Sequence, residues 1–135
     1  MKTRLSALVI ACAIGAPSAA LACGACIDDS VAATYDHAVI HTAIQTRRQV
    51  AFVTIEGPVD ATRLAKQVLA KAPRIRGVVS GTVRTSVAPP AFSFALDGTQ
   101  SPSAMVDAFR SAIAEPRAHL TLVRIMRDGA LVEPH

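Results

Sequence analysis

This sequence contains no tryptophan, one tyrosine and four phenylalanines among 135 residues. Proteins that bind single-stranded nucleic acid stack bases on aromatic side chains, so this scarcity argues against such a surface. Basic residues cluster only at Arg47-Arg48 and at Arg74-Ile75-Arg76, and solvated helix ends explain both pairs more simply. The sequence therefore predicts no nucleic-acid partner.

Long apolar runs are also missing. The run from Leu5 to Ile14 covers only ten residues, whereas a membrane helix needs about 20. Lys2 and Arg4 precede this run, and small residues stand at −3 and −1 of a cut before Cys23. These are the features of a cleaved secretory leader. We therefore predict a signal peptide over 1–22 and a periplasmic location for the mature chain.

Cysteine is scarce too, because the chain has only three and Cys12 lies in the predicted leader. The mature chain keeps Cys23 and Cys26, which is too few for a four-cysteine zinc site. In an oxidising compartment such a pair forms either a disulfide or a chelate for a soft metal ion. Lipidation of Cys23, which would anchor the protein to a membrane, is an alternative, although Ala20 stands where lipid signals prefer a leucine-like residue.

Loss of 22 residues leaves 113 of the 135, a length that suits one small domain with a modest core. Lys2 and Arg4 go with the leader, so the net charge falls from +4 to +2, again too little for a nucleic-acid surface. We expect four parts: the signal peptide (1–22), a Cys-x-x-Cys segment with a leading helix (23–48), a folded domain (49–126) and a polar tail (127–135).

No glycine or proline interrupts the chain from Asp28 to Arg48, and its alanines favour a helix. We expect one continuous amphipathic helix here, capped by the short polar side chains at 28–30. Apolar residues form one broad face of this helix. His37 and His41 lie on the opposite, polar stripe.

The rest of the chain alternates between strand-like and helix-like patterns. The expected strands are Gln49–Ile55, Gly77–Val87, Phe92–Leu96 and His119–Ile125, and the expected helices lie near Asp60–Ala72 and Ser103–Ala114. This order predicts an α+β, ferredoxin-like βαββαβ core preceded by an extra amphipathic helix. Its sheet would have the strand order 4-1-3-2, with one face under the two helices. The expected core residues are Val53, Ile55, Leu64, Val68, Val83, Phe92, Phe94, Phe109 and Leu122.

Three stretches carry a resemblance to a known family: the strand Val53–Gly57, which ends in glycine, the hairpin Gly77–Asp97 and the alanine-rich helix Ser103–Ala112. Together they resemble the heavy-metal-associated domain of small copper chaperones, P-type ATPase modules and periplasmic mercury-binding proteins. The resemblance implies a ferredoxin-like fold and metal handling. It supplies no ligands, because that family binds metal through a Cys-x-x-Cys loop after the first strand, and Gly57–Arg63 contains no thiol.

Cys23 and Cys26 are the stronger candidate site. Two thiolates can bind Cu(I) or Hg(II), and the free amine of Cys23 adds a nitrogen ligand for Cu(II) or Zn(II). A helix amino terminus nearby lowers the pKa of a thiol and favours the thiolate. Two other interpretations stay open. One is a structural disulfide, and the other is a redox motif, although a thioredoxin-type motif normally follows a strand.

His37 and His41 are spaced i, i+4, which places both rings about 6 Å apart on one helix face. Such a pair can hold Cu(II) or Zn(II), and the alternative is two solvated surface histidines. In a helix that starts near Asp28, His37 lies about 14 Å further along. Four ligands of one zinc ion must lie within about 4 Å of one another, so we expect the histidines and thiols to form separate sites.

We therefore predict a small exported protein that binds a soft metal ion, copper first and zinc or mercury next. It would sequester the ion or pass it to a protein partner by thiolate exchange. The alternatives are a periplasmic interaction module with a structural disulfide and a thiol-disulfide redox protein. No Ser/His/Asp arrangement or phosphate-binding loop stands out, so we do not expect an enzyme.

Overall fold

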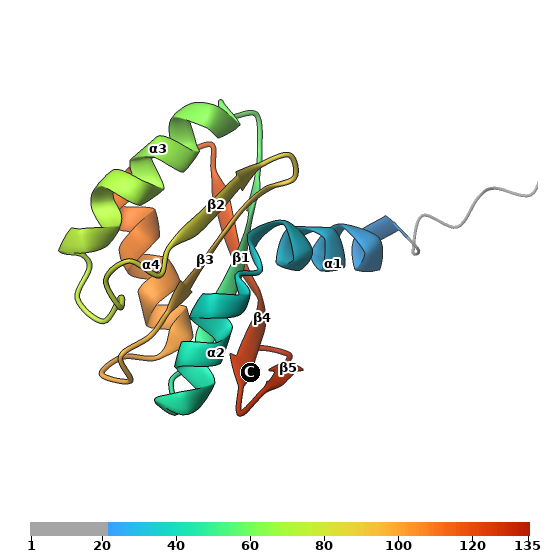
Figure 1. Ribbon diagram of the computed structural model, residues 1–135. Coiled ribbons are helices and arrows are strands. Elements are labelled where there is room, and N and C mark those ends of the chain that lie inside the picture. The colour runs from blue at the N-terminus through green and yellow to red at the C-terminus, as the bar shows by residue number, and fades with distance from the viewer. Residues whose placement is uncertain (1–21) are drawn as a thin grey trace, which may run out of the picture.

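The computed structural model describes residues 22–135, with side chains from Ile27 onward. It is a mixed α+β fold, in which helices pack against a five-stranded antiparallel sheet (Figure 1). The predicted signal peptide lies outside the described residues, except for the backbone of Ala22. No helix in the described part of the chain is long and apolar enough to cross a membrane.

Within residues 22–135, four α-helices and a short 3-10 turn pack around the sheet: α1 (Ala22–Thr34), α2 (His37–Gln45), α3 (Ala61–Lys71), η2 (Ala72–Arg74) and α4 (Pro102–Ile113). The strands are β1 (Val50–Glu56), β2 (Arg84–Val87), β3 (Pro90–Ala95), β4 (His119–Arg127) and β5 (Ala130–Val132). Their order is β2-β3-β1-β4-β5, so β1 lies at the centre. Counted from β4 to β2, the first four strands have the predicted order 4-1-3-2. The second strand is shorter than expected, because regular pairing begins only at Arg84.

A fifth strand follows at the carboxyl end, where the sequence suggests a polar tail over 127–135. β4 continues to Arg127, and β5 pairs with it in antiparallel fashion. Asp128 and Gly129 join the two strands with φ angles of 51° and 81°. Two successive positive φ angles form the I′ turn, which favours Asp-Gly. The expectation of a tail is therefore wrong, since Asp-Gly here is a hairpin signal.

The face of the sheet under α3 and α4 carries the larger core. Seven of the nine expected core side chains are buried here, and Val83 and Leu122 are half-buried and pack against them. Phe92, Phe94 and Phe109 form an aromatic cluster with ring centroids 4.9–6.0 Å apart. This part of the predicted core is confirmed.

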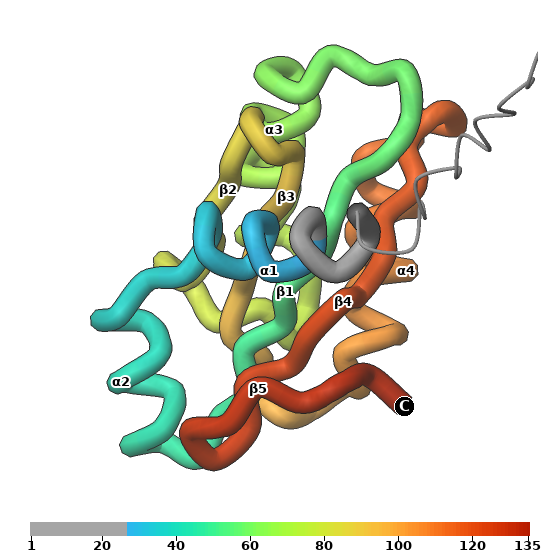
Figure 2. The backbone as a smooth tube through the Cα atoms, turned by 90° about the vertical axis from the view of Figure 1, so that its right-hand side faces the viewer, coloured from blue at the N-terminus to red at the C-terminus, as the bar shows by residue number. Residues whose placement is uncertain are grey.

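The opposite face is also covered, and the expectation of a sheet with only one covered face is wrong. α1 and α2 bury a second cluster on it, made of Val31, Val39, Ile40, Ala43, Val50, Phe52, Ala95, Val123 and Met126. Figure 2 shows α1 crossing β1 and β3 on this side. The cause lies in β1, where every residue from Val50 to Ile55 is buried. A strand that is apolar at consecutive positions needs cover on both faces.

The expected continuous helix over Asp28–Arg48 is wrong as well. α1 already begins at Ala22, so the polar residues at 28–30 lie inside it rather than at its cap. The chain then breaks at Tyr35-Asp36, and α2 begins at His37. Asp36 is extended (φ −123°, ψ 113°), and its carboxylate accepts hydrogen bonds from the amides of Ala38 (2.8 Å) and Val39 (3.1 Å). A short acidic side chain before an apolar run is a helix start, and here it divides one helix into two.

We expect truncation of a large core side chain on either face of the sheet to lower the stability of the protein. Phe52→Ala and Phe109→Ala should each lower the free energy of unfolding by roughly 3–5 kcal/mol, because both leave a large cavity in a packed core. Phe52 is 1 % exposed and Phe109 0 %. Leu69→Ala is the control, since Leu69 is 48 % exposed and its truncation should stay within about 0.5 kcal/mol. Urea denaturation measures all three. A loss below about 1 kcal/mol for Phe52→Ala would contradict the packing of α1 and α2 on the sheet.

Candidate functional site

Cys23 and Cys26 both lie in α1, because this helix begins at Ala22. The expectation that the two cysteines precede a helix starting near Asp28 is therefore wrong, because their backbone is already helical. Their side chains lie outside the described residues. Residues three apart are neighbours on a helix surface, so the helix brings the two cysteine positions to adjacent turns.

His37 and His41 lie one turn apart in α2, and both are exposed. His37 is the first residue of the helix and meets Tyr35 edge-on, with ring centroids 5.0 Å apart and planes at 73°. The Tyr35 ring in turn lies parallel to Phe52, at a centroid distance of 6.4 Å. Packing on the second core cluster orients Tyr35, and Tyr35 in turn contacts His37. His41 projects from α2 one turn further on.

The cysteine and histidine pairs lie on different helices, α1 and α2. From Cys26 to Thr34 the chain rises along α1 by about 12 Å, at 1.5 Å per residue. The break at Tyr35-Asp36 comes only after this separation. Among the described residues there is also no group of three or more His, Cys, Asp or Glu side chains that could hold a metal ion. The expectation of two separate sites stays a prediction, since the cysteine side chains lie outside the described residues.

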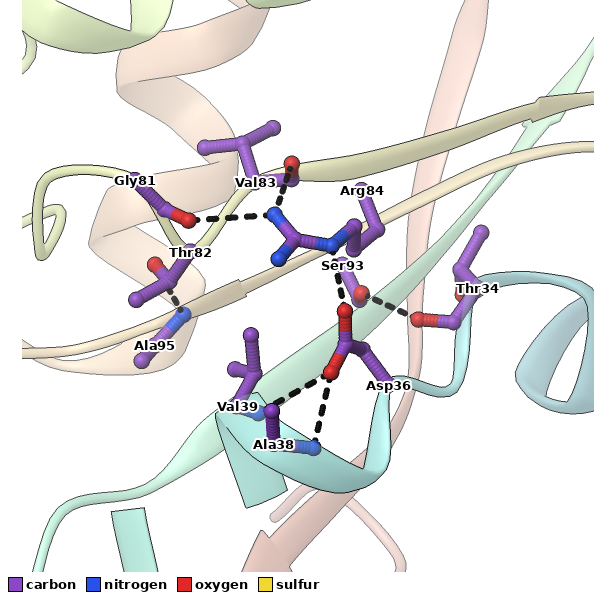
Figure 3. A network of polar contacts seen from close by, with 10 residues as sticks. All are labelled: Thr34, Asp36, Ala38, Val39, Gly81, Thr82, Val83, Arg84, Ser93 and Ala95. Atoms are coloured by element: carbon purple, nitrogen blue, oxygen red, sulfur yellow. Dashed lines mark hydrogen bonds and ion pairs between the residues drawn. The ribbon is translucent and has the colours of Figure 1, made fainter. Parts of the chain in front are cut away.

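Polar contacts fasten the junction between α1 and α2 to the edge of the sheet (Figure 3). The second carboxylate oxygen of Asp36 accepts a hydrogen bond from Nε of Arg84 at 2.7 Å. The Arg84 Nη1 atom donates to the carbonyls of Gly81 and Val83, both at 3.0 Å. The amide of Val39 and the Arg84 guanidinium hold the pKa of Asp36 below its usual range. One carboxylate thus caps α2 and also holds the loop that leads into β2.

A second set of contacts fixes the last turn of α1. Ser93 on β3 donates its hydroxyl to the carbonyl of Thr34 at 2.7 Å, and both residues are buried. Thr82 donates to the carbonyl of Val79 at 2.6 Å and accepts from the amide of Ala95 at 3.0 Å. These bonds satisfy polar groups that burial would otherwise leave unpaired. The bond from Ser93 fixes the end of α1 to β3, and the bonds of Thr82 fix the loop before β2 to the same strand.

Asp36 and Arg84 were not among the candidate residues from the sequence. Asp36 carries a readable signal, since an Asp before an apolar run marks a helix start. Its partner Arg84 is 48 residues away and carries none.

Next to the junction, Tyr35 and His37 share the wall of a shallow cavity of about 510 Å³ with Asp28, Val31, Ala32 and Leu131.

No protein-family model, curated protein or solved structure matches this chain. The function therefore has to be inferred from the residues and their arrangement. The heavy-metal-associated domain stays a hypothesis that only the sequence pattern supports.

Stability should depend on the charge of Asp36. The pKa of this carboxyl is lowered in the folded protein, so its charged form stabilises the fold above the unfolded pKa of about 3.9. That contribution is lost as the pH falls through the lower, folded pKa. We expect Asp36→Asn to melt at a lower temperature than wild type at pH 7, and the difference to shrink below about pH 4. Thermal melts followed by circular dichroism between pH 2.5 and 7 measure this.

The partner variant separates the ion pair from the cap. Arg84→Gln should lower the melting temperature of wild type at pH 7 but should have less effect in an Asp36→Asn background, because the pair is already gone. Equal effects in both backgrounds would show that Asp36 and Arg84 act independently.

Proposed function

We propose that this protein is exported and binds one soft metal ion, copper in the first instance, through Cys23 and Cys26. The observation that carries the proposal is that α1 runs through both cysteines. Residues one helical turn apart have Cβ atoms about 5–6 Å apart. A disulfide needs a Cβ separation of about 3.5–4.5 Å, whereas a metal with bonds of about 2.3 Å can join sulfurs up to about 4.6 Å apart. A helical Cys-x-x-Cys therefore suits a chelate better than a disulfide.

The position of the pair in the chain supports the same chemistry. With a leader cut before Cys23, the free amine of that residue adds a nitrogen donor. The first turn of a helix also favours thiolates over thiols, because its unpaired amides carry partial positive charge. Two thiolates leave Cu(I) open to a third ligand. An incoming cysteine or histidine of a protein partner can then displace one sulfur at a time, which is the chemistry of metal transfer.

The proposal includes a ferredoxin-like central unit. From β1 to β4 the element order is strand, helix, strand, strand, helix, strand, with η2 following the first helix. This order supports the resemblance to heavy-metal-associated domains. The additions are α1 and α2 on the second face and β5 at one edge. In this proposal the metal site has moved from the loop after β1 to the added helix α1.

His37 and His41 have a secondary role in this proposal. Their spacing in α2 suits Cu(II) or Zn(II), and both are exposed to solvent. In this proposal they share no ion with the thiols and would take up a different oxidation state or a different metal.

The intact mass of the protein, expressed with its own leader and analysed without reduction, is the first measurement. It reports the cut before Cys23, and a lipid on Cys23 would appear as a large added mass. A disulfide would make the chain about two mass units lighter, which would favour the interaction module with a structural disulfide. Thiol exchange with an oxidised substrate would favour a redox protein instead.

The decisive prediction concerns Cu(I). The reduced mature protein should bind one Cu(I) in competition with a chelator, more tightly at higher pH because the thiols must lose protons. Cys26→Ser should lose this binding, since one thiolate remains. The double variant His37→Ala, His41→Ala is the matched control, and it should keep Cu(I) binding but weaken binding of Cu(II) or Zn(II).

Two outcomes would contradict this assignment. Equal Cu(I) affinity in wild type and Cys26→Ser would remove the thiol site. Loss of Cu(I) binding in the double histidine variant would mean that thiols and histidines share one ion, which contradicts the proposal of two separate sites.

A further inference from the structure

A cavity of about 670 Å³ is lined by residues at one end of the sheet. Figure 1 shows this end, where β1 begins and where β3 and β4 end. Three separate segments line the cavity: the end of α2 with the link to β1 (46–49), the loop between β3 and α4 (96–102), and Arg127 at the end of β4. Arg47, Arg48 and Arg127 bring three guanidinium groups to this one hollow. Asp97 is the only acidic residue among its lining, so the charge of the wall is +2.

The backbone at the end of α2 presents two of these arginines together. The amide of Arg48 donates to the carbonyl of Ala43 at 2.8 Å, and that of Arg47 donates to the carbonyl of Ile44 at 3.1 Å. These two bonds are the Schellman motif that ends many helices. Its left-handed position is usually glycine, but here it is Arg47, with φ 53°. A residue other than glycine is strained in this left-handed conformation. Strain of this kind is retained most often at functional positions.

None of the three arginines forms an ion pair at contact distance within the described residues, although the hydrogen bonds from Thr99, together with the nearby charge of Arg48, lower the pKa of Asp97. Within the described residues, neither Arg47 nor Arg48 has a side-chain hydrogen bond or an ion pair at contact distance. Arg127 is oriented by the neutral amide of Gln49, whose oxygen accepts from its Nε at 3.0 Å and from its Nη2 at 3.3 Å once the amide is turned toward it. Asp97 is engaged by Thr99, which donates its amide at 2.8 Å and its hydroxyl at 2.6 Å to one carboxylate oxygen.

We propose that this cavity binds a phosphate-class oxyanion through Arg47, Arg48 and Arg127. Guanidinium groups match the oxygens of phosphate in geometry and charge, and their hydrogen bonds to it are among the stronger ones in proteins. Thr99, Gln100 and Ser101 add neutral polar groups to the wall. The volume exceeds that of phosphate alone, so an organic group attached to the phosphate also fits. This site does not depend on the metal site in α1, and it opens at the far end of α2 from His37.

The test uses the full chain, expressed with its own leader and purified without phosphate. Calorimetric titration with sodium phosphate is compared with sodium chloride at matched ionic strength, because a general charge effect follows ionic strength alone. We expect saturable binding of one phosphate and none of chloride. Phenyl phosphate distinguishes the sources: tighter binding than inorganic phosphate assigns the site to a phosphate monoester, and weaker binding assigns it to the free ion.

Arg48→Gln and Arg127→Gln should each weaken phosphate binding about tenfold, the usual effect of losing a charge-assisted hydrogen bond. Arg74→Gln is the matched control, because it removes the same charge from an exposed residue outside the lining and should leave the affinity unchanged. Arg47→Gly separates binding from folding. Glycine adopts the left-handed conformation of residue 47 without strain, so the melting temperature without phosphate should stay the same or rise. The affinity for phosphate should fall, because a guanidinium group is lost.

The proposal is overturned if phosphate binding does not saturate. It is also overturned if Arg48→Gln and Arg127→Gln bind phosphate as tightly as Arg74→Gln does. Wild-type affinity in Arg47→Gly, with the fold intact, would likewise count against it.

Discussion

Burial of β1 on both faces is the constraint on which the rest of this structure depends. Val53 and Ile55 face the core under α3 and α4, while Val50 and Phe52 face the cluster under α1 and α2. Exposing the second set to water would forfeit about 1.5–3 kcal/mol for each large side chain. The amino-terminal segment therefore cannot be a loose extension of the domain, and its helices form a second layer of the core.

A second layer also explains why the leading helix is broken. A single straight helix over 28–48 would be about 30 Å long, whereas α1 crosses the strands and α2 packs further along the sheet. The break at Tyr35-Asp36 lets both helices contact the sheet. Asp36 stabilises it twice, by capping α2 and by its ion pair with Arg84. The same break sets Tyr35 against Phe52 and places His37 at the edge of that contact.

Both proposed sites use residues of this amino-terminal segment, although the anion site also needs the loop between β3 and α4 and Arg127 of β4. The cysteines are at the start of α1, and the arginines Arg47 and Arg48 follow α2. The loop after β1 contains no thiol, so the proposed metal site depends on the added helix α1 rather than on the central unit. Metal binding at one end of this segment and anion binding at the other would be separate activities.

Much of the fold could be predicted from local patterns. The alternation of apolar residues in the strands and the apolar faces of α3 and α4 predicted which side chains face the core. Phe92, Phe94 and Phe109 are buried, as this pattern predicts. The neighbours of β1 also followed from the order of elements. The hairpin turn at Asp128-Gly129 and the cap at Asp36 carried local signals too, although a single turn or cap residue is weak evidence beside a long periodic pattern.

The sequence by itself thus determined most of the helices and strands from β1 to β4, and which residues could supply thiols, imidazoles or guanidinium groups. Only the tertiary structure decided which of these groups lie together. The pairing of Asp36 with Arg84, and the cavity that Arg47 and Arg127 both line, bring together residues far apart in the chain. Periodicity is a property of neighbours along the chain, whereas contact across a sheet depends on strand order and on which faces are covered. For that physical reason the second layer and the arginine-lined cavity had to come from the folded molecule.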